Sequence, residues 1–230
     1  MCYNQPTSFL LFGLGVLSIL YINIMKSQLP YQYITFILLF YTCMELLQAI
    51  QYSYVNQCDN KINKVLTEIA YGFVIVQPLL WNVFFYLNSK GCDKSILMVG
   101  IVLSSIWLVV NLLGRIMYTP ENRIKKESSV FAGETVCTRK NQSHLFWEWT
   151  SANFGEFNAN FLMHLLIWMV PALITMQHRV AAILLIISVC IGVFMAYISG
   201  EYYIFTSAWC YISVPIVIGL LVIETLRRLN

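Results

Sequence analysis

The sequence predicts an all-α protein, a polytopic integral membrane protein whose single domain, residues 1–230, is a seven-transmembrane-helix bundle. Of its 230 residues, 59% are hydrophobic and only 11% are charged, whereas soluble domains carry about 25% charged residues. The mean hydropathy is +0.69. The apolar runs are continuous and lack the alternating pattern of membrane-barrel strands, which indicates helices.

Seven apolar stretches are long enough to cross a hydrocarbon core, which needs about 20 residues of helix. They cover about 8–25, 31–54, 65–87, 95–118, 155–177, 180–198 and 203–226. We expect the first to be a retained anchor, because nothing basic precedes Ser8 and no small-residue cleavage site follows it. One sizeable loop remains, the outer loop 119–150, and there is no room for a soluble domain.

The second span carries a carboxylate at membrane depth. Glu45, Gln48 and Tyr52 share one helical face with Tyr41 when the helix turns by about 100° per residue. Because ionisable groups are costly inside a bilayer, Glu45 is a functional-site candidate. Two roles are open for it, which are lining a cavity and hydrogen bonding between helices.

The third span contributes Gln77, which is followed by Pro78. A proline within a span removes a backbone donor, frees a carbonyl and often kinks the helix. Pro171 and Pro215 interrupt the fifth and seventh spans in the same way. We therefore place Gln77 among the polar candidates of the bundle interior.

The stretch "HLFWEWTSANFGEFNANFLMH" at 144–164 concentrates polar and aromatic side chains before the fifth apolar run. In a continuous helix, Asn153, Glu156, Asn160 and His164 share one arc, which favours a water-accessible cavity over a purely structural polar seam. The aromatic residues are interpreted as a belt at the membrane interface. They are Phe146, Trp147, Trp149, Phe154 and Phe157.

His144 and Glu148 have the i, i+4 spacing of a metal-binding pair on a helix. The chain offers no recognisable third ligand, so no metal is expected. Both residues instead join the candidate polar cavity.

Loop charge and cysteine placement predict the orientation. Loops 1, 3 and 5 and the C-terminus carry basic residues almost without acids, which favours an outer or lumenal N-terminus and a cytoplasmic C-terminus. Outer cysteines pair in oxidising compartments, so at least one disulfide is expected, with its connectivity open. The candidates are Cys2, Cys58, Cys137 and Cys210. Asn141, in "NQS", is a candidate N-glycosylation acceptor.

Several functions are excluded by missing residues. The last lysine is Lys140, so the seventh span cannot form a retinal Schiff base, and no other cofactor is expected. The net charge of +3 is spread over loops, which argues against a nucleic-acid partner. The partners expected are membrane lipid and a small solute or ion, and a homo-oligomer is compatible with the sequence.

Several pieces, taken together, resemble a family of small seven-span membrane proteins of microbes and large DNA viruses that has no assigned activity. The pieces are "MC" at 1–2, "MELLQAIQY" at 44–52, "NQCDNKINKVLTEIAYG" at 56–72, "QP" at 77–78, "HLFWEW" at 144–149 and "AWC" at 208–210. The resemblance implies a virion or host membrane as a location. It also implies that these residues belong to the family pattern: Glu45, Gln48, Cys58, Asp59, Asn60, Gln77, His144, Trp147, Glu148, Trp209 and Cys210.

One position departs from that family pattern. Ala132 stands where the family has a second cysteine in the long loop. The partner of Cys137 therefore stays open among Cys2, Cys58 and Cys210.

Three functions fit these observations. The first is a non-enzymatic membrane protein that binds or conducts a small polar solute or ion through an outer-facing polar cavity. The alternatives are an intramembrane lipid-modifying enzyme that uses His144 or Glu148, and a structural scaffold of a membrane or virion.

Overall fold

The computed structural model describes residues 4–24, 33–118, 133–141, 144–151, 161–200, 205, 214–219 and 222. Most of these residues are helical. The elements are α1 (Gln5–Ile24), α2 (Ile34–Gln51), the short 3-10 helix η2 (Tyr52–Tyr54), α3 (Lys61–Leu87), α4 (Asp93–Met117), β1 (Cys137–Asn141), β2 (His144–Glu148), α5 (Phe161–Ile174) and α6 (Arg179–Ser199). The described residues of the predicted seventh span, 205, 214–219 and 222, are helical as well.

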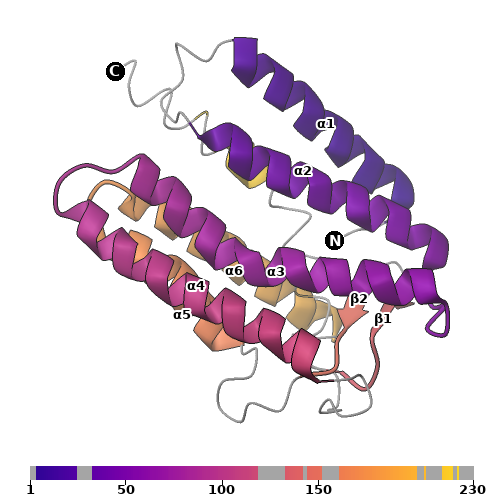
Figure 1. Ribbon diagram of the computed structural model, residues 1–230. Coiled ribbons are helices and arrows are strands. Elements are labelled where there is room, and N and C mark those ends of the chain that lie inside the picture. Colours follow the sequence, from indigo (N-terminus) through magenta and orange to yellow (C-terminus); the bar gives the residue numbers. More distant parts are fainter. Residues whose placement is uncertain are drawn as a thin grey trace.

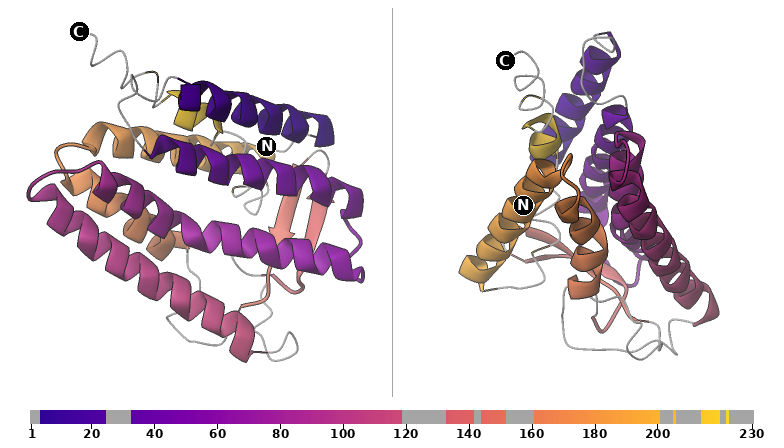
Figure 2. Two further views of the ribbon diagram at one scale, coloured as in Figure 1. Left: turned by 45° about the horizontal axis from the view of Figure 1, so that its top comes forward. Right: turned by 90° about the vertical axis from the view of Figure 1, so that its left-hand side faces the viewer.

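The helices run back and forth along one common direction, with the β-hairpin at one end (Figures 1 and 2). Helix α3 contacts α2, α4, α5 and both strands, and α5 contacts α3, α4 and α6. Helix α1 packs on α2. We call the end that carries β1 and β2 the hairpin end. The opposite end, with the α3–α4 and α5–α6 turns, is called the turn end.

Helix α4 buries several small and polar residues and exposes many aliphatic ones. In α4, the buried positions include Gly100, Ser104 and Asn111, whereas Val99, Ile106 and Val109 are more than half exposed. This distribution is the one expected when the surrounding solvent is apolar. Five described helices are long and apolar enough to cross a membrane, and α5, at Phe161–Ile174, is a shorter apolar helix. The predicted start of this span, 155–160, lies outside the described residues.

Asn82 joins three helices at the point where Pro171 interrupts α5. Because Pro171 has no N–H, the carbonyl of Ile167, four residues earlier, loses its helical donor. The Asn82 side-chain amide lies 3.0 Å from that carbonyl and 3.0 Å from the Ser104 hydroxyl of α4. Gly100 allows this approach, since an added Cβ would lie 2.5 Å from the Asn82 oxygen. The polar residue at Asn82 thus compensates for the proline, as apolar surroundings require.

The described part of the predicted loop 119–150 contains an antiparallel hairpin, in which Cys137 faces Glu148 across the two strands. The interfacial aromatic belt predicted from the sequence is wrong for Trp147 and Trp149, as their burial shows. Trp147 is 1% exposed and Trp149 is 0% exposed, and their rings stack with centroids 5.6 Å apart. Their indole N–H groups donate to Gln51 and to the Thr67 carbonyl, so these tryptophans anchor the hairpin in the bundle.

A disulfide between Cys58 and Cys137 confirms the prediction of a bond among the four candidate cysteines. It joins the loop before α3 to the first residue of β1. The register of the hairpin and the loop position of Cys58 bring the two residues within a Cα–Cα distance of 5.1 Å. Cys2 and Cys210 lie outside the described residues.

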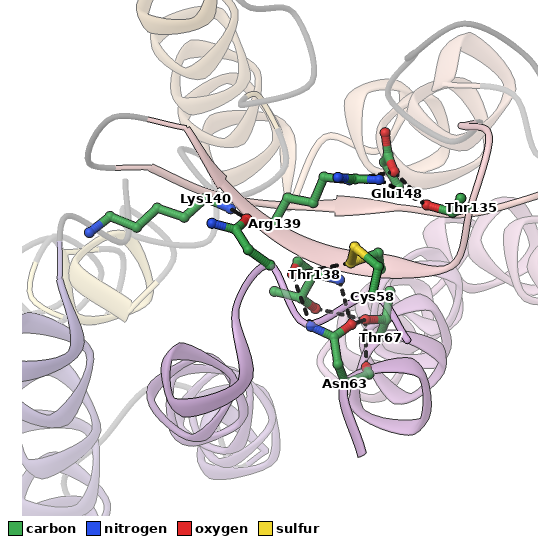
Figure 3. Close-up of polar contacts among 10 residues, drawn as sticks. Cys58, Asn63, Thr67, Thr135, Thr138, Arg139, Lys140 and Glu148 are labelled. Atoms are coloured by element: carbon green, nitrogen blue, oxygen red, sulfur yellow. Dashed lines mark hydrogen bonds and ion pairs between the residues drawn. A yellow bond between two sulfur atoms is a disulfide. The ribbon is translucent and has the colours of Figure 1, made fainter. Parts of the chain in front are cut away.

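A buried set of hydrogen bonds supports the disulfide (Figure 3). The Asn63 amide donates to the carbonyls of Tyr54 and Thr138 at 2.7 and 3.0 Å, and its oxygen accepts from the Thr138 N–H at 2.9 Å. The hydroxyls of Thr67 and Thr138 lie 2.7 Å apart. We call Asn63, Thr67 and Thr138 the hairpin clamp, because α3 uses it to pair with β1 as a neighbouring strand would.

The turn end is held by side chains that reach across the two turns. The Gln177 amide donates to the carbonyl of Asn88 at 2.6 Å. The Ser89 hydroxyl donates its single proton to the Phe85 carbonyl at 2.7 Å and lies 2.7 Å from Nε2 of His178. Since that proton is already used, Ser89 accepts from Nε2–H, which fixes the neutral tautomer of His178.

Removing the clamp amide tests its contribution. We expect Asn63→Ala to lower the free energy of unfolding by about 2 kcal/mol, because the buried Thr138 N–H loses its described acceptor. The carbonyls of Tyr54 and Thr138 each lose one of two donors and keep the N–H groups of Gln57 and Asn56. The measurement is thermal or denaturant unfolding in detergent. Asn23→Ala is the matched control, since Asn23 is exposed and bonds only within its own helix in the described structure. Equal effects of the two variants would contradict the role of the clamp.

His178 predicts a dependence of stability on pH. Burial lowers the pKa of His178 below its ordinary value of 6.5 to about 4, although the Asp93 carboxylate opposes the shift. Between pH 4 and pH 6.5, His178 is protonated in the unfolded chain and neutral in the folded chain. The contribution of neutral His178 to the free energy of unfolding is therefore fully present above pH 6.5. It falls by up to about 3 kcal/mol as the pH drops to 4.

The measurement is the unfolding midpoint at several pH values for the wild type and His178→Gln. Glutamine can donate to Ser89 but does not titrate, so we expect a flatter profile for the variant. Parallel profiles would refute the assignment.

Candidate functional site

Helices α1 and α2 bring together three buried polar side chains. The Gln5 amide donates to the Ala49 carbonyl at 3.0 Å, which fixes the start of α1 against the end of α2. One turn further along α1, the Ser8 hydroxyl faces the Glu45 carboxylate without a hydrogen bond of normal geometry. Gln48 lies one turn from Glu45 on the same face of α2. We call Ser8, Glu45 and Gln48 the polar trio.

Gly15 makes this close contact of α1 with α2 feasible. An added Cβ at Gly15 would lie 2.1 Å from the Thr42 hydroxyl oxygen, which is closer than side-chain atoms can approach. Thr42 itself donates to the Leu38 carbonyl at 2.7 Å and keeps its polar group inside α2. The glycine therefore lets the backbone of α1 lie directly on α2 and cover the polar trio.

The polar trio is buried without a hydrogen bond of normal geometry to any described protein atom. Ser8 and Glu45 are each 1% exposed, and Gln48 is 0% exposed. Both Glu45 oxygens, both polar atoms of the Gln48 amide and the Ser8 hydroxyl have no hydrogen-bond partner among the described protein atoms. Buried polar groups are almost always paired, and an unpaired group at such a position indicates a functional role or a ligand.

The chemistry of this group favours a positive species. A carboxylate that is ionised and buried without a partner costs several kcal/mol, so it is either protonated or shared with a cation. The Gln48 carbonyl and the Ser8 hydroxyl are oxygen ligands of the kind that small cations accept. The polar trio can thus hold a proton on Glu45, or a small cation between its oxygens.

Gln77 lies beside this group. Its side chain is 3% exposed, and its amide nitrogen is 3.8 Å from the sulfur of Met44, the residue before Glu45. Gln77 is thus buried in the bundle, and its part in a polar cavity stays a prediction. Its amide is held by a weak sulfur acceptor.

His164 is buried on α5, but its described ring contacts are aromatic. Its ring lies 6.2 Å from the Trp107 ring of α4 and 5.7 Å from the Trp168 ring. The ring centres of Trp168 and Trp81 lie 6.3 Å apart, and the Trp81 indole N–H donates to the Tyr41 hydroxyl at 2.8 Å. This aromatic row crosses the bundle from α4 to α2 and ends one turn from Glu45.

Glu148 lies on the hairpin and does not join the polar trio. Its carboxylate accepts from Nε of Arg139 at 2.8 Å and from the Thr135 hydroxyl at 2.7 Å (Figure 3). The interpretation of His144 and Glu148 as a helical i, i+4 pair is wrong, because residues 144–148 form strand β2. No group of three or more His, Cys, Asp or Glu residues within the described ranges could hold a metal ion.

Three predicted cavity residues, Asn153, Glu156 and Asn160, lie outside the described residues. Asn141 is the last residue of β1 and pairs with His144 at the tip of the hairpin, and its glycosylation stays a prediction.

The structure also adds residues that the sequence patterns did not single out. Ser8 and Gly15, seven residues apart, share the buried face of α1 with Leu11. This small-residue spacing was the available signal for Ser8. Thr138 had no such signal, because its partner Asn63 is 75 residues away in the sequence.

Comparison with protein families gives one match. The model of a family of unknown function, DUF5765, matches residues 6–229. Neither the curated proteins nor the solved structures contain a match. Since the match covers both helices of the polar trio, the clamp and the predicted seventh span, the chain belongs to the family of unknown function DUF5765.

Proposed function

We propose that this chain is a multi-pass, seven-span membrane protein that binds or conducts a small polar solute or ion, with a proton or small cation as the species handled at Glu45. The observation that carries the proposal is the unpaired carboxylate of Glu45, which is 1% exposed and lies beside the equally unpaired Gln48. Intramembrane carboxylates in proton relays and ion pathways are buried in this way.

The neighbours of the polar trio support exchange of the bound species. Helix α1 has few buried residues, and α2 is the described helix with which it makes its most extensive contact. It covers the polar trio by a glycine contact rather than by interlocked large side chains. A small displacement of α1 would therefore open the polar trio without disturbing the clamp or the Asn82 contacts.

The orientation we propose places the hairpin end outside or in the lumen and the C-terminus in the cytoplasm. The disulfide supports it, since such bonds persist in oxidising compartments. The first residues of α1 and the end of α2 lie at that same end, because Gln5 contacts Ala49 and Ser53. The polar trio is thus near the outer side, where the outer-facing cavity is predicted.

Flux through liposomes tests the role of Glu45. We expect the reconstituted wild type to relax a proton or alkali-cation gradient, and Glu45→Gln to reduce that flux at least tenfold, because glutamine can neither carry a proton nor neutralise a cation. We also expect Glu45→Gln to unfold at a higher temperature, since the substitution removes a buried carboxylate that has no partner.

The matched control is Glu148→Gln, which removes a carboxylate from the hairpin and leaves the polar trio intact. Its flux should stay near that of the wild type. Equal flux in the wild type and Glu45→Gln, for protons and for each cation tested, would overturn the proposal. A stabilised Glu45→Gln variant with unchanged flux would show that the carboxylate destabilises the fold and has no role in transport.

A further inference from the structure

A cavity, which we call the second cavity to keep it apart from the predicted polar cavity at Glu45, lies at the hairpin end, between the start of α3 and the chain leading into and out of the hairpin. Its volume is about 800 Å³. The wall on α3 is formed by Lys64, Val65, Glu68 and Ile69, which lie on one face at i, i+1, i+4 and i+5. Asp59 precedes α3, and Glu134 precedes β1. The Cys58–Cys137 disulfide fixes these two segments beside each other.

The charges of this cavity favour a cation. Arg115 neutralises Glu68, with Nε 3.5 Å from the carboxylate, and its guanidinium lies 3.8 Å from the centre of the Tyr71 ring. In the described part of the chain, neither Asp59 nor Glu134 forms an ion pair. Two carboxylates therefore remain against the single ammonium of Lys64, which suits a ligand that carries both a cation and an anion.

A buried hydroxyl provides an independent polar contact. Thr150 lines the cavity and is 3% exposed, yet its hydroxyl has no hydrogen-bond partner among the described atoms. Its carbonyl is occupied, because it accepts from Nη1 of Arg115. A ligand with an N–H or O–H group would satisfy the hydroxyl, which is otherwise a costly buried group.

The apolar part of the cavity continues onto the outer surface of α3. Val65 and Ile69 are 49% and 43% exposed, and they lie on the side of α3 that would face lipid. A ligand that reaches this cavity along α3 comes from the adjacent bilayer leaflet and can leave its acyl chains there. None of the described lining residues is aromatic, whereas quaternary ammonium groups are recognised by aromatic cages.

We propose that this cavity binds the headgroup of a phospholipid with a primary amine, of the phosphatidylethanolamine type. Asp59 and Glu134 accept from the ammonium group, Lys64 contacts the phosphate and the Thr150 hydroxyl pairs with a headgroup polar atom. This binding is separate from the proposed solute or ion binding at Glu45.

The experiment measures lipid retained by the purified full-length protein after exchange into mixed nanodiscs. The nanodiscs contain equal amounts of phosphatidylethanolamine, phosphatidylcholine and phosphatidylglycerol with identical acyl chains. We expect about tenfold enrichment of the ethanolamine lipid over the other two, as for one or two charge-assisted hydrogen bonds. The double variant Asp59→Asn, Glu134→Gln should lose this enrichment, and Glu148→Gln should keep it.

Two further arms identify the source of the amine and the independence of the site. Water-soluble phosphoethanolamine should compete weakly, because it lacks the acyl chains that lie along Val65 and Ile69. Glu45→Gln should retain the lipid preference, so a failure of ion flux leaves this proposal intact. Equal retention of the three lipids, unchanged preference in the double variant, or full displacement by phosphoethanolamine would each overturn the assignment.

Discussion

The bundle depends on hydrogen bonds that α3 makes from its buried side chains to the elements around it. Asn63 and Thr67 bond to β1, Tyr71 donates to Asn111 of α4 at 2.9 Å, and Asn82 reaches the interrupted backbone of α5. These bonds fix which helices are the neighbours of α3. They also give its buried polar side chains partners inside the bundle, as a helix long and apolar enough to cross a membrane needs.

The polar trio differs from the buried polar residues of α3, because its side chains have no hydrogen-bond partners among the described atoms. Along α3, most buried amides and hydroxyls have protein partners, whereas Ser8, Glu45 and Gln48 are equally buried and have none among the described atoms. Other described atoms, such as Asn82 Oδ1, Trp107 Nε1 and Thr150 Oγ1, are also buried without a partner, but the polar trio gathers five such atoms on two neighbouring helices. Their unpaired state therefore favours a transient ligand over a packing role, with the cost in stability that functional sites commonly carry.

The hairpin end shows how a covalent bond and a hydrogen-bond network act together. The disulfide joins residues that are 79 positions apart in the sequence. The clamp holds β1 against α3 next to that bond. Closing so long a loop restricts the unfolded chain, which adds to the stability that the clamp provides in the folded one. This rigid end holds the walls of the second cavity, because Asp59 and Glu134 flank the two bonded cysteines in the chain.

The sequence by itself determined the helical class, the approximate bounds of α1 to α4 and α6, and the shared face of Glu45 and Gln48. These features follow from composition and from a period of about 3.6 residues, which are local properties. Only the tertiary structure decided that 144–148 is a strand, that Trp147 and Trp149 are buried, that Cys137 pairs with Cys58, and that Ser8 faces Glu45. Each of these depends on residues far apart in the chain, and a tryptophan that can bury its ring and still donate its N–H has no local pattern that distinguishes it from one at a membrane interface.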